Sequence, residues 1–320
     1  MRLRWPRMST AAATSATSSG TPKHSSKWAW AHTTIRWIFI LACALAIGPA
    51  VSMPLARLQD ADGGHAVTML LSASTAQGMI ATLAVVIAAA AVAAIGAWFF
   101  SAGTAFACSG LVLGWGAWRM ADADAILRRT RDGSDLARVS IENALIVLIA
   151  ASLTVLIGVL TMRRQTAKMI RPDSPAGYLA TDAKGRGSMS VAAISFGAGT
   201  LAAGIVAFLG AATMAKGQAV FAACLAGIAA GVVCHLVARG QNGLATPTLV
   251  VLCALLPATA GPIVAQAMHG SRIMDATFGG SLLPLARIVS LDWACGLMLG
   301  VPVGLGWAGA MLDERSADRE

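Results

Sequence analysis

Residues 78–118, GMIATLAVVIAAAAVAAIGAWFFSAGTAFACSGLVLGWGAW, form a run of 41 residues without a charged side chain. As one α-helix this run would be about 60 Å long, which is twice the roughly 30 Å hydrocarbon thickness of a membrane. The run must therefore fold back on itself. The small residues at 101–104, SAGT, are the natural turn, so we predict two spans, at about 78–99 and 104–118.

Six further uncharged runs are long enough to cross a bilayer as helices, at about 35–54, 143–162, 189–214, 218–238, 245–268 and 289–311. We therefore predict an all-α, polytopic transmembrane helix bundle of about eight spans with a cytoplasmic N-terminus. In the alternative, 104–118 re-enters on the same side and the chain has seven spans. The distribution of Lys and Arg does not separate these topologies, but Trp115 and Trp118 beside Arg119 favour a full crossing.

The composition excludes several classes of protein. The chain is 57% hydrophobic and 12% charged, whereas soluble domains average roughly 45–50% apolar and about 25% charged residues. A disordered chain, a disulfide scaffold and an ordinary soluble enzyme are all inconsistent with these values. The net charge of +9 favours contact with anionic phospholipids, and the absence of a soluble basic domain argues against nucleic acid as a partner.

We expect three parts along the chain: a disordered basic cytoplasmic arm at 1–34, the helical domain at 35–311 and a charged cytoplasmic tail at 312–320. The loop after residue 162 begins with Arg163, Arg164, Lys168 and Arg171, which we expect to lie against lipid headgroups. The Arg-, Ala- and Gly-rich composition is typical of a bacterial genome. We therefore expect a multi-pass protein of the bacterial cytoplasmic (inner) membrane.

The six cysteines all lie inside apolar runs, so we interpret them as buried small residues, with no metal and no cofactor bound. A weak candidate for a divalent ion is the first outer loop, which carries Asp60, Asp62 and His65. Acidic residues at this position resemble those of membrane glycosyltransferases that use lipid-linked donors. That similarity is one of position only.

Close helix packing in membranes depends on small residues, because these allow backbones to approach each other. Gly296, Gly300 and Gly304 repeat at the GxxxG spacing in the last span, and Gly227 and Gly231 do so at 218–238. The triple motif predicts that the last span lies centrally in the bundle.

The span at 245–268 is interrupted by prolines and is the best candidate for a binding site. Broken helices near the membrane midplane expose carbonyl and amide groups that transporters use to bind ions or substrates, although a proline can also produce a simple kink. Asp292 is the nearest acidic residue to the apolar interior, and Ser290 could cap the last helix before it. The candidate substrate or ion site comprises Pro257, Thr259, Gly261, Pro262, Gln266 and Asp292.

The sequence carries few groups that could do chemistry. Our leading interpretation is therefore a non-catalytic membrane component, such as a scaffold, assembly factor or complex subunit, with a membrane-protein partner or a second copy of itself. The first alternative is a small-solute or ion transporter that uses the proline-broken span. The second is an outer-face, metal-dependent, lipid-linked transferase.

Overall fold

The computed structural model describes residues 26–59, 63, 67–121, 123–130, 135–168, 189–213, 215–240 and 245–317. The described residues are helical or lie in turns and connections, and they contain no strand. Seven helical segments are long and apolar enough to cross a membrane. The prediction of an all-helical, multi-pass membrane protein is thus confirmed in this coarse form, while the choice between seven and eight spans stays a prediction.

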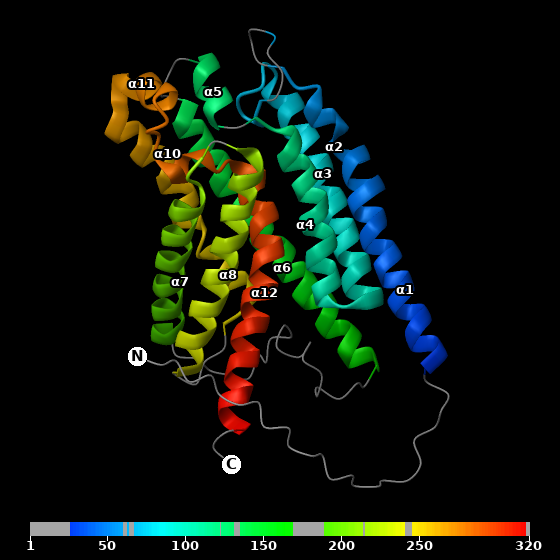
Figure 1. Cartoon of the computed structure of the whole chain (residues 1–320). Helices are drawn as coiled ribbons and strands as arrows, with labels where there is room; N and C mark the ends of the chain where they lie inside the picture. The colour runs from blue at the N-terminus through cyan, green and yellow to red at the C-terminus, as the bar shows by residue number, and fades with distance from the viewer. Residues whose placement is uncertain are drawn as a thin grey trace, which may run out of the picture.

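The first third of the chain forms one group of helices (Figure 1). Its elements are α1 (Ser26–Ala42), the π-helical turn η1 (Cys43–Ile47), α2 (Gly48–Ala56), α3 (Thr75–Ile95), η2 (Gly96–Phe100) and α4 (Ala102–Arg119). The first three are continuous and act as one span. The indole of Trp115 on α4 donates to the carbonyl of Ala44 at 2.6 Å. This bond ties α4 to the π-helical turn, where the carbonyls are offset from the regular α-helical pattern.

The remaining elements are α5 (Ala123–Thr130), α6 (Asp135–Lys168), α7 (Met189–Gly210), α8 (Lys216–Gly240), α9 (Pro247–Leu252), α10 (Leu255–His269), η4 (Gly270–Arg272), α11 (Ile273–Phe278), η5 (Pro284–Arg287) and α12 (Ser290–Ala317). Helices α7, α8 and α10 form the second group, and α6 and α12 run between the two groups (Figure 1).

The chain reverses between α3 and α4 at Ser101, within the segment from which we expected a turn. Ser101 is extended, and its hydroxyl accepts from the amide of Thr104 at 3.2 Å, as an N-cap does. Gly96 permits the sharp reversal, because a Cβ there would lie 2.8 Å from the Cα of Ala105. The turn is thus shorter than predicted, and α4 begins directly after its cap.

Glycines bring α8 and α12 into backbone contact. A Cβ at Gly300 would lie 2.1 Å from the carbonyl oxygen of Cys224, and one at Gly304 would lie 2.3 Å from that of Ile228. In return, a Cβ at Gly231 would lie 3.0 Å from the amide of Leu305. The two GxxxG motifs therefore face each other. The central position of α12 follows, since it contacts α4, α6, α8 and α9.

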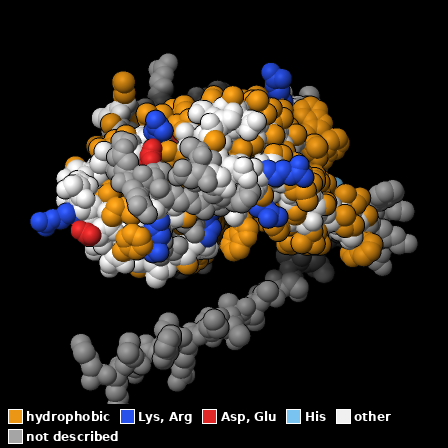
Figure 2. Space-filling model, turned by 90° about the horizontal axis from the view of Figure 1, so that it is seen from above, with side chains coloured by type: hydrophobic (Ala, Val, Ile, Leu, Met, Phe, Trp, Pro, Cys, Tyr) orange, Lys and Arg blue, Asp and Glu red, His pale blue; other side chains and the backbone are white. Residues whose placement is uncertain are grey.

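The bundle has two ends. The upper end in Figure 1 carries α5, α11 and the starts of α6, α8 and α12, whereas the lower end carries the starts of α1, α4, α7 and α9. The flanks expose large apolar side chains, for example Leu45, Ile80 and Leu209, as a lipid-facing surface requires. Figure 2 shows these hydrophobic side chains around the flanks and only a few charged ones on the upper end.

Candidate functional site

A buried carboxylate lies at the upper end of the bundle. Glu142 is 1% exposed, and its two oxygens accept from the amides of Met69 (3.3 Å) and Leu70 (3.0 Å). The hydroxyl of Ser290, which we expected to cap α12, donates instead to Glu142 Oε1 at 2.6 Å. One carboxylate thus joins three parts of the chain: α6, the segment before α3 and the start of α12.

A buried ion pair lies near the same start of α12. Asp292 is fully buried in the first turn of α12, and both of its oxygens lie 3.0 Å from Lys216 Nζ. Lys216 also donates to the carbonyl of Ala121 at 3.3 Å, and the amide of Val289 donates to Asp292 at 3.2 Å. A buried charge is costly unless it is paired, so Lys216 and Asp292 satisfy each other and link the start of α8 to the first turn of α12.

The proline segment of α10 is bonded to α6. Pro262 has no amide proton to donate to the carbonyl four residues before it, that of Ala258. The side-chain amide of Asn143 donates to this carbonyl at 2.8 Å and also reaches Ile288 O at 3.4 Å. The hydroxyl of Ser140 donates to Thr259 O at 2.7 Å. Residues 140–143 of α6 therefore connect the interrupted helix to the start of α12.

The break itself lies before Pro257. Helix α9 ends at Leu252 and α10 begins at Leu255, so the predicted single span at 245–268 is two helices. The reason is that Pro257 cannot donate to the carbonyl of Cys253, and the turn there opens. Further along α10, Gly261 packs against Leu285, whose backbone carbonyl oxygen would lie 2.9 Å from a Cβ at that position.

A buried arginine holds the connection into α12. The Arg287 side chain donates to the carbonyls of Ala211 and Ala212 at the end of α7, and to those of Gly280 (2.8 Å) and Leu282 (2.8 Å). Ala211 and Ala212 directly follow α7, which ends at Gly210. Arg287 therefore fixes the chain after α7 to the loop before α12.

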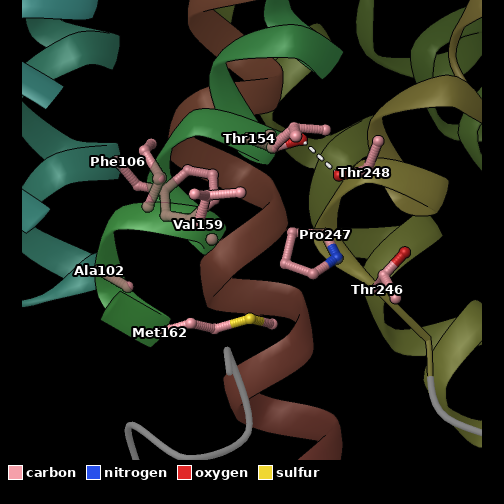
Figure 3. A pocket seen from close by; sticks show the side chains of 11 residues that line it. Ala102, Phe106, Thr154, Val159, Met162, Thr246, Pro247 and Thr248 are labelled. Atoms are coloured by element: carbon pink, nitrogen blue, oxygen red, sulfur yellow. Dashed lines mark hydrogen bonds between the residues drawn. The ribbon is translucent and has the colours of Figure 1, made fainter. Parts of the chain in front are cut away.

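A cavity of about 340 Å³ lies at the opposite, lower half of the bundle, among α4, α6 and the start of α9. Its walls are mostly apolar, and the hydroxyls of Thr154 and Thr248 bond to each other across it at 2.9 Å (Figure 3). The side chains of Val155 and Val159 line it and are 49% and 43% exposed, so the cavity reaches the outer flank of α6. The complete lining comprises Ala102, Phe106, Thr154, Val155, Ile157, Gly158, Val159, Met162, Thr246, Pro247 and Thr248.

The predicted site residues do not form one cluster, because five of them lie on α10 and Asp292 lies on α12. Pro257, Gly261 and Pro262 are buried on α10, where Thr259 and Gln266 are half-buried. The Thr259 hydroxyl bonds within its own helix, to Leu255 O at 2.8 Å. Asp292 pairs with α8 and is joined to α10 only indirectly, through α6 (Glu142 and Asn143). Whether these residues bind a substrate or ion stays a prediction.

The predicted headgroup and metal residues are only partly described. Arg163 is exposed, whereas Arg164 is half-buried and donates to the carbonyl of Phe100. Arg171 and the side chain of Lys168 lie outside the described residues, as do Asp60, Asp62 and His65. Within the described part of the chain, no group of three or more His, Cys, Asp or Glu side chains is arranged to hold a metal ion.

Glu142, Asn143 and Lys216 are not among the site residues predicted from the sequence. The fourth span was predicted to begin at residue 143, but α6 begins at Asp135 and places Glu142 two turns inside the helix. A usable signal was present: Leu136, Val139 and Asn143 follow helical spacing and are all buried. The helix could therefore have been extended toward the N-terminus.

Searches for relatives give no further indication of role: no protein-family model, no curated protein and no solved structure matches this chain.

Proposed function

We propose that this membrane protein is a transporter of a small, largely apolar solute, and that the structure represents a state closed at the upper end and open at the lower end. The observation that carries the proposal is the contrast between these two ends. Bonded ionisable side chains join α6, α8 and α12 at the upper end, whereas a cavity of about 340 Å³ lies among α4, α6 and α9 at the lower end.

The upper contacts have the character of a gate. The pair of Lys216 and Asp292 links α8 to α12, and the bond from Ser290 to Glu142 links α12 to α6. Alternating access requires contacts that can break when the helix groups rock against each other around a central site. Side-chain bonds between helices can do so without unfolding any helix.

The cavity suits a ligand with few polar groups. Its volume lies at the lower limit of the roughly 300–1,000 Å³ that is typical of small-molecule sites, and such sites combine apolar walls with a few polar groups. Here the polar groups are the paired hydroxyls of Thr154 and Thr248. A solute with one hydrogen-bonding group could replace the bond between them.

The interrupted helix supplies a hinge next to the cavity. Pro247 and Thr248, at the start of α9, form one wall, and the break between α9 and α10 follows within two turns. Proline-broken helices are frequent where transporters bind and move their substrates. The prolines of α10 thus support the transport interpretation through the position of the hinge.

The gate can be tested by labelling. In a reconstituted variant with all six natural cysteines changed to Ala, the cavity mutation Met162→Cys, at a half-buried position of the lining, should react with a soluble maleimide. Lys216→Gln should weaken the upper contacts, close the cavity part of the time and slow the labelling several-fold. Lys216→Arg keeps the charge and should restore the rate, and Ile80→Cys, which is on the lipid-facing side of α3, should be insensitive. An unchanged rate in a folded Lys216→Gln protein contradicts the proposal.

A non-catalytic component is the second proposal. It is favoured by the several hydrogen bonds that Glu142 and Arg287 each make within the chain, which are typical of a rigid frame. It predicts a stable partner or a second copy on gentle detergent extraction, together with labelling that does not depend on Lys216. Repeated isolation as a lone protomer would count against it.

The remaining expectations have weaker support. The long apolar helices indicate a membrane protein, whereas the bacterial cytoplasmic membrane, the cytoplasmic N-terminus and the contact of Arg163 with anionic lipids stay predictions. The lipid-linked transferase depends on Asp60, Asp62 and His65, which lie outside the described residues, and it stays a prediction.

A further inference from the structure

The cysteines of this chain pair across helices. All six are free thiols, yet Cys43 on η1 contacts Cys108 on α4 through a side-chain hydrogen bond. In the second group, the sulfurs of Cys234 on α8 and Cys253 at the end of α9 lie 3.5 Å apart. These four residues therefore form two thiol pairs, each of which joins two helices.

Helix α7 is shaped around the second pair. The thiol of Cys234 donates to the carbonyl of Ser195 at 3.2 Å, and that of Cys253 approaches the carbonyl of Phe196 at 3.5 Å. A Cβ at Gly199 would lie 2.2 Å from one sulfur and 2.8 Å from the other. Glycine is thus required at this position, because any side chain would occupy the space of the sulfurs.

One buried hydroxyl beside the pair has no partner, and a second lies against a thiol. Ser195 is 0% exposed, and its hydroxyl oxygen has no hydrogen-bond partner among the described residues. Ser195 shares the helix face of Gly199, four residues later. Thr200 is 9% exposed, and its hydroxyl lies within hydrogen-bonding reach of the Cys253 thiol. Buried polar atoms normally have partners, so an unused donor next to two thiols calls for an explanation.

We propose that Cys234 and Cys253 form a two-coordinate site for a soft monovalent metal ion, Cu(I) or Ag(I). Thiolates are the ligands that select Cu(I), and two of them suffice for a linear or bent site. A structural zinc site needs four ligands, and no such cluster is present in the described residues.

The hydroxyls of Ser195 and Thr200 can stabilise the negative charge that the site acquires when the ion binds. Each thiol releases its proton to water when the ion binds, so two thiolates and one monovalent cation carry a net charge of −1. Hydrogen bonds to the charged form stabilise it. Ser195 and Thr200 can donate to the sulfurs in the loaded site, which accounts for the Ser195 hydroxyl that has no other partner among the described residues.

The first pair provides an internal control. Ser109 follows Cys108 on α4, but its hydroxyl already donates to the carbonyl of Ala105 at 2.8 Å. It is therefore not available to stabilise thiolates at Cys43 and Cys108. We expect this pair to bind the same ions much more weakly.

Competition with bathocuproine disulfonate for Cu(I) tests the site. The chain with Cys43, Cys108, Cys224 and Cys295 changed to Ala should take one Cu(I) per protein. Adding Cys234→Ala or Cys253→Ala should lower the affinity about 100-fold, because the second ligand no longer acts at high effective concentration. Ser195→Ala with Thr200→Val should lower it about 10-fold. The reciprocal protein that keeps only Cys43 and Cys108 should bind weakly.

Absence of Cu(I) transfer to the folded two-cysteine protein, or equal affinity in the single-cysteine variants, would overturn the proposal. A second measurement needs no substitution. In the unmodified chain, one equivalent of Ag(I) should protect Cys234 and Cys253 from alkylation in SDS, as read by peptide mass spectrometry. Protection spread evenly over all six cysteines would also refute the site.

Discussion

Replacing Gly300 by Ala should weaken the contact between α8 and α12. The added Cβ would lie 2.1 Å from the carbonyl oxygen of Cys224 and 3.0 Å from its carbonyl carbon. Ordinary contacts of a carbon with a carbonyl oxygen are about 3.3 Å, so the helices must move apart by about 1 Å. Neither obstructing atom belongs to a flexible side chain that could turn away, and the movement must therefore involve the backbone.

The size of the destabilisation by Gly300→Ala can be isolated with a matched control on the same helix. A Cβ at Gly306 meets no atom within 4 Å, so Gly306→Ala changes only the helix propensity, by up to about 1 kcal/mol in favour of the helix. Gly300→Ala gains the same propensity and loses packing. The difference between the two variants therefore isolates the cost of overpacking, which is about 1–3 kcal/mol.

Equilibrium unfolding in mixed micelles measures this difference. The SDS fraction is increased while circular dichroism follows the helix content. We expect Gly300→Ala to unfold at lower SDS than the unmodified chain, and Gly306→Ala at equal or higher SDS. Equal midpoints for the two variants would refute the backbone contact between α8 and α12.

Three further changes test the upper network and the topology. Asp292→Asn should destabilise the fold by about 3–5 kcal/mol, because it leaves the charge of Lys216 buried without a counter-charge. Asp292→Leu combined with Lys216→Met removes both charges and should recover much of this loss. A double-mutant cycle of unfolding in SDS measures the coupling between the two residues. Asn143→Ala should cost about 1–3 kcal/mol by removing the partner of a buried carbonyl, and less in the Pro262→Ala background, where the backbone amide can supply the bond; equal costs in both backgrounds would contradict this role. Alkaline phosphatase and green fluorescent protein fusions after residues 103 and 130 should report opposite sides of the membrane, and fusions reporting one side would establish the re-entrant alternative.

Much of the fold could be predicted because lipid imposes a length on every apolar run. The chain reversal near Ser101 follows from the 41 uncharged residues at 78–118 alone. The central position of α12 follows from the spacing of its glycines, because few other residues permit backbone contact. Pro257 indicated a break between α9 and α10. The break lies one turn before Pro257, because the carbonyl that loses its donor is that of Cys253, four residues earlier.

The site could be predicted only in part, because its bonds join distant segments. The candidate residues were chosen for lying in one broken span, whereas the structure joins α10 to α12 through Asn143 and Glu142 of α6. Lys216 was interpreted as part of a short loop, since nothing in the sequence relates it to Asp292, 76 residues later. Such pairings come from tertiary packing, which hydropathy and spacing do not encode.

The same reasoning explains why α4 is not among the seven strongly apolar helices. Its 18 residues span about 27 Å, close to the hydrocarbon thickness, but glycine, serine and two tryptophans lower its mean hydropathy. A helix must be apolar only where it faces lipid, and α4 buries most of its surface against α2, α3 and α12. Gly110 and Gly116 would each place a Cβ within 3 Å of a leucine side chain on α12. These glycines lower the mean hydropathy of α4 and also allow its close packing, and we expect α4 to cross the membrane fully as the eighth span.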